Sequence, residues 1–170
     1  MSQSNERRPA QAEPPVPSRP VEVVGDDHGR PLTTNAAAAA WYRAAQGSVV
    51  HGDGPDTALR RALRADPSFA VAACDLLALT DDPPHTEPAR PSTSWERHHC
   101  EIVAEAHRDV ARASGYLREH LAVVGCDPLA MHIVCAALST VHHNGDRIAD
   151  IADLVASIPA CHAPASSRDV

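Results

Sequence analysis

The sequence contains no lysine, and all 15 of its basic residues are arginine. Acidic residues outnumber them at 22, which gives a formal net charge of -7. A protein with a negative net charge is poorly suited to binding nucleic acid, because a phosphate backbone requires clustered positive charge on its partner. We therefore expect no nucleic-acid partner.

Aromatic residues are also scarce, at 3% of 170 residues, whereas hydrophobic residues together make up 44%. The core must consist mainly of Ala, Leu, Val and Ile, which disfavours an aromatic-rich β-sandwich. The sequence contains no run of the roughly 18 apolar residues that a membrane-spanning helix needs. The first 20 residues also lack the apolar run of a secretory signal. We therefore expect a cytoplasmic protein with no membrane partner.

The five cysteines are an odd number in a sequence without a recognisable signal. This combination argues against a disulfide framework, since disulfides are typical of secreted domains with paired cysteines. We expect all five to be small apolar side chains in a reducing compartment. They are Cys74, Cys100, Cys126, Cys135 and Cys161.

Proline divides the chain into segments. Residues 1–32 are rich in Pro, Ser, Glu and Arg and predict a disordered tail, in which Val21–Val24 is at most transiently extended. A second Pro-rich segment, 81–92, predicts a loop, and the polar residues 159–170 predict a flexible tail. The segment between the tails, 33–158, is therefore expected to form one domain.

Apolar residues within this domain recur at the spacing of helices. Helix starts and stops are marked by caps, turns and prolines, for example the capping-box pattern Thr93–Glu96 and the stop at Pro67. The resulting prediction is an all-α fold of six or seven helices, over residues 35–47, 56–66, 69–79, 94–107, 110–124, 129–142 and 146–158.

Two stretches, 58–79 and 115–138, share one pattern: an amphipathic helix, an Asp-Pro connection and an apolar helix rich in small residues. Repetition of this kind is typical of α-solenoids, in which each hairpin buries its apolar face against the next. Leu59, Ala62 and Pro67 have the spacing found at the end of a tetratricopeptide (TPR) repeat. In the second stretch the corresponding pattern is matched less closely.

The chain thus resembles TPR proteins, and residues 95–134 are similar to the subgroup related to tetratricopeptide repeat protein 38. The resemblance implies an α-solenoid of stacked antiparallel hairpins that binds a peptide or helix of a partner protein without catalysis. The candidate contacts are polar residues on the first helices of the hairpins: Arg43, Arg97 and Glu101. The last helix, 146–158, could pair with a second copy, which leaves a homodimer open.

The alternative function depends on the adjacent residues His98, His99 and Cys100, with Glu96 on the same helical face as His99. These residue types predict a small helical metal-binding protein or metal-dependent enzyme. However, a zinc site needs about four converging ligands, and the sequence has neither a CxxC nor an HExxH motif. It also lacks nucleotide-binding and serine-hydrolase motifs. We therefore expect no metal, no cofactor and no catalysis, with His99 a hydrogen-bonded packing residue and His98 solvated.

Overall fold

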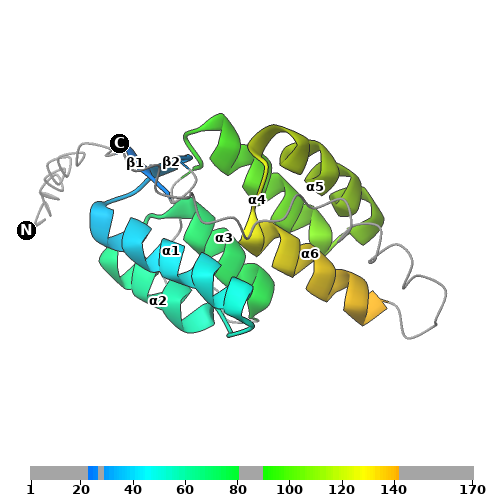
Figure 1. The fold of residues 1–170 in the computed structure, drawn as a ribbon, viewed down its shortest axis with the longest axis horizontal. Helices are drawn as coiled ribbons and strands as arrows, with labels where there is room; N and C mark the ends of the chain where they lie inside the picture. The colour runs from blue at the N-terminus through cyan, green and yellow to red at the C-terminus, as the bar shows by residue number, and fades with distance from the viewer. Residues whose placement is uncertain (1–22, 27–28, 81–89, 142–170) are drawn as a thin grey trace, which may run out of the picture.

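The computed structural model describes residues 23–26, 29–80 and 90–141. In these ranges a two-stranded hairpin precedes six helices, so the predicted all-α class is confirmed apart from this small sheet (Figure 1). No helix in the described ranges is both long enough and apolar enough to cross a membrane. The elements are β1 (Val23–Gly25), β2 (Pro31–Thr33), α1 (Ala36–His51), α2 (Asp56–Ala65), α3 (Ala70–Leu79), α4 (Ser94–Ala106), α5 (Val110–Val124) and α6 (Pro128–Val141).

Helices α1, α4 and α5 begin where polar side chains accept otherwise unpaired backbone N–H groups, whereas α2 and α3 have no side-chain cap. The side chain of Asn35 accepts the amide of Ala38 at the start of α1, and Asp109 accepts the amide of Arg112 at the start of α5. The predicted capping box is present at α4, where Thr93 and Glu96 satisfy each other's backbone amides. The predicted helix 146–158 lies outside the described residues.

The hairpin is an element that the sequence analysis did not predict. β1 and β2 pair antiparallel, with Val24 opposite Leu32, inside the segment 1–32 that was expected to be disordered. The connection includes Gly29 at a φ of 73°, a backbone conformation that glycine adopts without strain. Leu32 is fully buried, so the hairpin is held by packing against the helices and not by its own strand propensity.

A single carboxylate fastens this hairpin to α4. Glu96 accepts the backbone amide of Thr33 at 2.6 Å with one oxygen and the hydroxyl of Thr33 at 2.8 Å with the other. The second oxygen also accepts the amides of Ser92 and Thr93. The carboxylate that completes the capping box of α4 is therefore also the long-range link to β2, which explains why Glu96 is buried.

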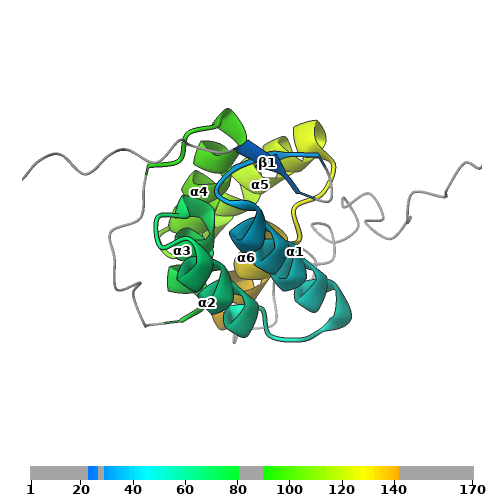
Figure 2. The ribbon, with the colours of Figure 1, turned by 90° about the vertical axis from the view of Figure 1, so that its left-hand side faces the viewer.

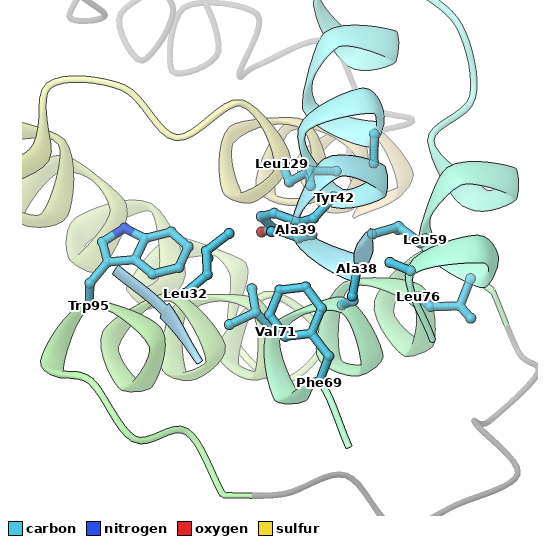
Figure 3. Packing of buried hydrophobic residues seen from close by; sticks show 13 residues of the cluster. Leu32, Ala38, Ala39, Tyr42, Leu59, Phe69, Val71, Leu76, Trp95 and Leu129 are labelled. Atoms are coloured by element: carbon cyan, nitrogen blue, oxygen red, sulfur yellow. The ribbon is translucent and has the colours of Figure 1, made fainter. Parts of the chain in front are cut away.

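The apolar core has two clusters. The first lies between the hairpin and α1 to α3, where Tyr42 packs edge-on against Phe69 with ring centroids 5.3 Å apart. Figure 3 shows Leu32 between Trp95 and the other labelled side chains of this cluster. The second cluster lies between α4, α5 and α6 and includes Ile102, Leu117 and Ile133.

Helix α6 connects the two clusters. It contributes Leu129 to the first and Ala130, Ile133, Val134 and Leu138 to the second. It contacts α1 and α3 as well as α4 and α5, and Figure 2 shows it beside α1. In an open solenoid each hairpin contacts only its neighbours. The stacked arrangement that the TPR resemblance implies is therefore not confirmed by these contacts.

The position of α6 predicts the effect of shortening Leu129, which is fully buried. We expect Leu129→Ala to lower the free energy of unfolding by about 2–5 kcal/mol, because it removes apolar contacts and leaves a cavity. The matched control is Leu77→Ala on α3, whose side chain is 52% exposed and which should change stability by less than about 0.5 kcal/mol. Urea denaturation of both variants measures the difference, and equal losses would contradict the central position of α6.

Candidate functional site

A chain of buried polar side chains runs through the molecule between the helices. Its members are Tyr42 on α1, Asp75 on α3, His99 on α4, His120 on α5 and Asp127 immediately before α6. Each of them is at most 1% exposed. Charged and polar groups are buried in this way only when they are paired, so the contacts among them define the arrangement.

The imidazole of His99 is held between two carboxylates. Its Nε2 lies 2.7 Å from Oδ1 of Asp75, and its Nδ1 lies 2.8 Å from Oδ2 of Asp127. The hydroxyl of Tyr42 donates to the other oxygen of Asp75 at 2.9 Å. An imidazolium is the form of histidine that donates from both ring nitrogens, as this geometry requires.

The charges fix the protonation states of these groups. Burial lowers the pKa of His99, but the charges of Asp127 and Asp75 outweigh burial and raise that pKa well above 6.5. Burial raises the pKa of Asp127, but the charge of His99 and the hydrogen bonds from His120 and His99 bring it far below 3.8. Burial and the charge of Asp75 raise the pKa of Tyr42 above 10. At neutral pH the site therefore holds a histidine cation, an aspartate anion and a neutral tyrosine.

Asp127 has a second role at the start of α6. Its Oδ1 accepts the backbone amide of Ala130 at 3.3 Å, while its Oδ2 accepts Nε2 of His120 at 3.0 Å in addition to His99. The Asp127-Pro128 pair thus begins a helix, as the sequence predicts, and also supplies a buried counterion, which the sequence did not predict.

A second buried cation, Arg30, joins the network from the hairpin. Its guanidinium pairs with Asp26, donates to the carbonyl of Cys126 and lies 3.8 Å from Asp127. Its Cζ also lies 4.8 Å from the centre of the Trp95 ring, a cation–π contact. Trp95 is therefore a packing anchor against the network and not an exposed ligand platform.

The network reaches the surface through His98. Nδ1 of His120 lies 3.3 Å from Nδ1 of His98, so one of these two nitrogens is the donor and the other the acceptor of a hydrogen bond. His98 is half-buried and lines a cleft of about 320 Å³ between α4 and α5. The lining residues are His98, Glu101, Ala104, Glu105, Arg108, Tyr116 and Glu119.

The lining of this α4–α5 cleft is acidic. Three carboxylates, Glu101, Glu105 and Glu119, face one guanidinium, Arg108. At its edge Arg112 donates from Nε to the hydroxyl of Tyr116 at 2.8 Å and lies 5.3 Å over the Tyr116 ring. The same guanidinium lies 3.8 Å from Glu105. Arg112 thus contacts two residues of the cleft, Glu105 and Tyr116, but is not itself among the lining residues and remains largely exposed.

The three predicted contact residues lie in different places. Glu101 lines the cleft, whereas Arg97 is exposed on α4 and is not part of the lining. Arg43 donates to the carbonyl of Gly25 at 3.0 Å and so holds the hairpin to α1. The structure brings only Glu101 into the cleft.

The neighbours His98, His99 and Cys100 point in different directions, because successive residues on a helix are about 100° apart. His98 faces His120, His99 lies between the two aspartates, and Cys100 lies against Cys74, whose Sγ is 3.7 Å from the Cys100 carbonyl. Among the described residues no three His, Cys, Asp or Glu side chains are arranged to hold a metal ion. His99 is buried and hydrogen-bonded, as expected.

Cys126 differs from the expectation that every cysteine is a free thiol. It is disulfide-bonded, whereas Cys74, Cys100 and Cys135 are free. The prediction of five free thiols is therefore wrong at this position.

The buried partners of His99 were not predicted from the sequence. A signal was present for Asp75, which is a charged residue in the otherwise apolar helix Ala70–Leu79. Such a residue needs a buried partner, since an isolated carboxylate is costly to remove from water. Nothing in the sequence identifies that partner as a histidine 24 positions further on.

Comparisons with known proteins identify no relative. No protein-family model matches the chain, and neither the curated proteins nor the solved structures include one with significant similarity.

The charged state of His99 predicts how stability depends on pH. Since the pKa of His99 is higher in the folded than in the unfolded chain, its contribution is complete below about pH 6.5 and declines as the pH rises through the folded value. We expect the free energy of unfolding to fall above pH 7 by up to about 1.4 kcal/mol per pH unit.

Urea denaturation between pH 7 and 9 measures this slope. The control His107→Gln, at an exposed position, should keep it, whereas His99→Gln should lose it. Nitrogen NMR should also show protons on both ring nitrogens of His99 at pH 7. A neutral His99 at that pH would contradict this assignment.

Asp127→Asn removes one of the two counterions of a buried cation. Breaking a buried ion pair costs about 3–5 kcal/mol, because the remaining charge cannot be solvated, and we expect a loss of that size. Asp53→Asn, which changes the same charge at an exposed position, is the control and should change stability little. The melting temperatures of the two variants test this prediction. Equal melting temperatures would show that charge pairing does not stabilise the network.

Proposed function

We propose that this protein is a non-catalytic binding module whose α4–α5 cleft holds side chains of a partner protein's peptide. The observation that supports this most directly is the cleft itself, with a volume of about 320 Å³. That volume is at the lower end of the range for small-ligand pockets and fits one or two side chains. The cleft is also lined by Glu101, one of the three contact residues predicted from the sequence.

The buried network supports a role without catalysis. His99, Asp75 and Asp127 have residue types common in active sites, yet each is fully buried. A catalytic group must come within hydrogen-bond reach of its substrate. These three side chains are instead occupied by one another, which is the arrangement of a structural ion cluster.

The TPR resemblance is kept as part of the proposal. The helices α1 and α2 pack extensively on each other, as do α4 and α5, and such hairpins are the building units of TPR proteins. The position of α6 across both halves departs from an open stack. The proposed docking site is accordingly the cleft on the α4–α5 hairpin and not an extended concave groove.

The alternative of a metal-binding protein has no supporting geometry in the part of the chain that the structure describes. His98, His99 and Cys100 diverge, and His99 is already held by two aspartates. We therefore place binding of a peptide ahead of binding of a metal.

A bulky side chain in the cleft tests the proposal. Ala104 lines the cleft and is exposed, so Ala104→Trp should fill the cavity without disturbing the core. We select peptides from a random library on the immobilised full chain. We expect them to bind this variant at least about tenfold more weakly than they bind the unchanged chain. Fluorescence anisotropy with labelled peptides measures the change.

The matched control is Ala44→Trp, at an exposed position on α1 that does not line the cleft. This variant should bind as the unchanged chain does. Selection of no peptide at all would contradict the proposed function, and equal weakening in both variants would show that the cleft is not the docking site.

A further inference from the structure

We infer that Cys74 on α3 and Cys100 on α4 are a modification site, at which a low-molecular-weight disulfide such as oxidised glutathione converts the two thiols into a reversible disulfide bond. The inference is independent of the proposed binding cleft. It follows from the contact between the two cysteines, from the ion pair that fixes their helices, and from the surroundings of the two sulfurs.

The two cysteines meet where α3 packs on α4. The thiol of Cys74 donates to the backbone carbonyl oxygen of Cys100, with Sγ and the oxygen 3.7 Å apart. The side chains of Cys74 and Cys100 are also hydrogen-bonded to each other, and both thiols are free. A disulfide needs Cβ atoms about 3.5–4.5 Å apart, and a sulfur in contact with the backbone of the neighbouring helix shows that the helices approach closely here. We therefore expect the bond to form by rotation of the two side chains.

A buried ion pair holds the two helices together beside this contact. Asp75 follows Cys74 on α3, and His99 precedes Cys100 on α4. Oδ1 of Asp75 lies 2.7 Å from Nε2 of His99, and both residues are fully buried. The ion pair and the cysteine pair are thus adjacent links between the same two helices. Because the folded chain keeps the thiols together, each has a high effective concentration toward the other.

The surroundings of the sulfurs set the order in which they react. The hydrogen bond with Cys74 and burial raise the pKa of the Cys100 thiol. The charges of Asp75 and Glu96 raise it further. The thiolate is the nucleophile in disulfide exchange, so Cys100 is a poor first nucleophile. Cys74 is half-buried, and we assign the first attack to it.

The reaction consists of two thiol–disulfide exchanges. The Cys74 thiolate attacks one sulfur of the small disulfide, whose S–S bond breaks, and the released thiolate takes up the proton that Cys74 lost. Sγ of Cys100 then attacks Sγ of Cys74 and loses its proton to the second departing thiolate. One small disulfide is reduced to two thiols, and the two cysteines are oxidised to one disulfide. Proximity offsets the raised pKa of Cys100 in this second step.

Two other described cysteines serve as references. Cys126 is disulfide-bonded, so the fold is compatible with oxidised cysteine. Cys135 on α6 is a free, half-buried thiol, and burial alone raises its pKa, so no neighbouring thiol acts on it. We therefore expect Cys135 to remain a free thiol under conditions that oxidise Cys74 and Cys100.

Incubation of the full chain with oxidised glutathione tests the inference. The remaining thiols are alkylated in denaturant, and the peptides are mapped by mass spectrometry. We expect the peptides that contain Cys74 and Cys100 to be linked, Cys135 to be alkylated, and dithiothreitol to reverse the link. Alkylation of Cys74 and Cys100 to the same extent as Cys135, or links from either of them to another cysteine, would overturn the inference.

Single substitutions separate the two steps of the reaction. Cys100→Ser should leave one glutathione attached to Cys74, whereas Cys74→Ser should leave Cys100 at least about tenfold less modified than Cys74 is in the first variant. The matched control Cys135→Ser should form the link as the unchanged chain does. Equal glutathione adducts on Cys100 and on Cys74 in the two variants would overturn the assigned order of attack.

The bond should also raise thermal stability. It closes a loop over residues 75–99, and closing a loop lowers the entropy of the unfolded chain. On oxidation we expect the melting temperature of the unchanged chain to rise by at least about 5 °C more than that of Cys74→Ser. Both chains contain Cys126, so its disulfide affects them equally. Equal changes in the two chains, measured by calorimetry, would contradict a bond that fits the folded arrangement of α3 and α4.

Discussion

The fold depends on a histidine cation enclosed by two aspartates in a region without solvent. His99 contacts Asp75 on α3 and Asp127 before α6, so one imidazole joins three elements that are distant in the sequence. Removing such charges from water is costly, and replacement of a whole buried ion cluster by apolar residues is often neutral or stabilising. Its contribution lies in geometry: the helices must adopt one mutual position for every charge to be satisfied. In a core built mostly from small aliphatic residues, which interlock less than aromatic ones, this constraint helps to define a single packing.

The parts of the fold that local sequence determines were predictable. Capping residues such as Asn35 and Thr93 and the apolar spacing, which act over a few residues, predicted six helices close to those observed, although α1 continues past the predicted end at residue 47 to His51. The β-hairpin was not predictable in this way, because Leu32 and Thr33 owe their positions to contacts with residues on other helices. The same limit applies to α6, whose contacts with α1 depend on the whole assembly. The apolar sequence of a helix predicts that the helix is buried, but it does not predict which elements pack against it.

In the candidate site, too, some residues could be predicted from local sequence and others depend on long-range contacts. Glu101 was named from its polar character on a first helix, and it lies in the cleft. The other members of the cleft come from α4, from α5 and, for Arg108, from the connection between them, and their proximity follows from the packing of α4 on α5. The buried network was hidden for a different reason: Asp75 stands out as a charge in an apolar helix, but no local pattern pairs Asp75 and Asp127 with His99. The His98–His120 contact then connects this interior to a residue that lines the cleft.

Asp127 has one further consequence, which concerns motion at the start of α6. The first amides of a helix ordinarily have no partner inside the helix and exchange readily with solvent. Here the amide of Ala130 is bonded to a carboxylate that also holds two imidazoles in the interior. Opening this first turn would leave the buried cation with fewer partners, so the turn cannot fray independently of the core. The amide hydrogen of Ala130 should therefore exchange as slowly as those in the middle of α6.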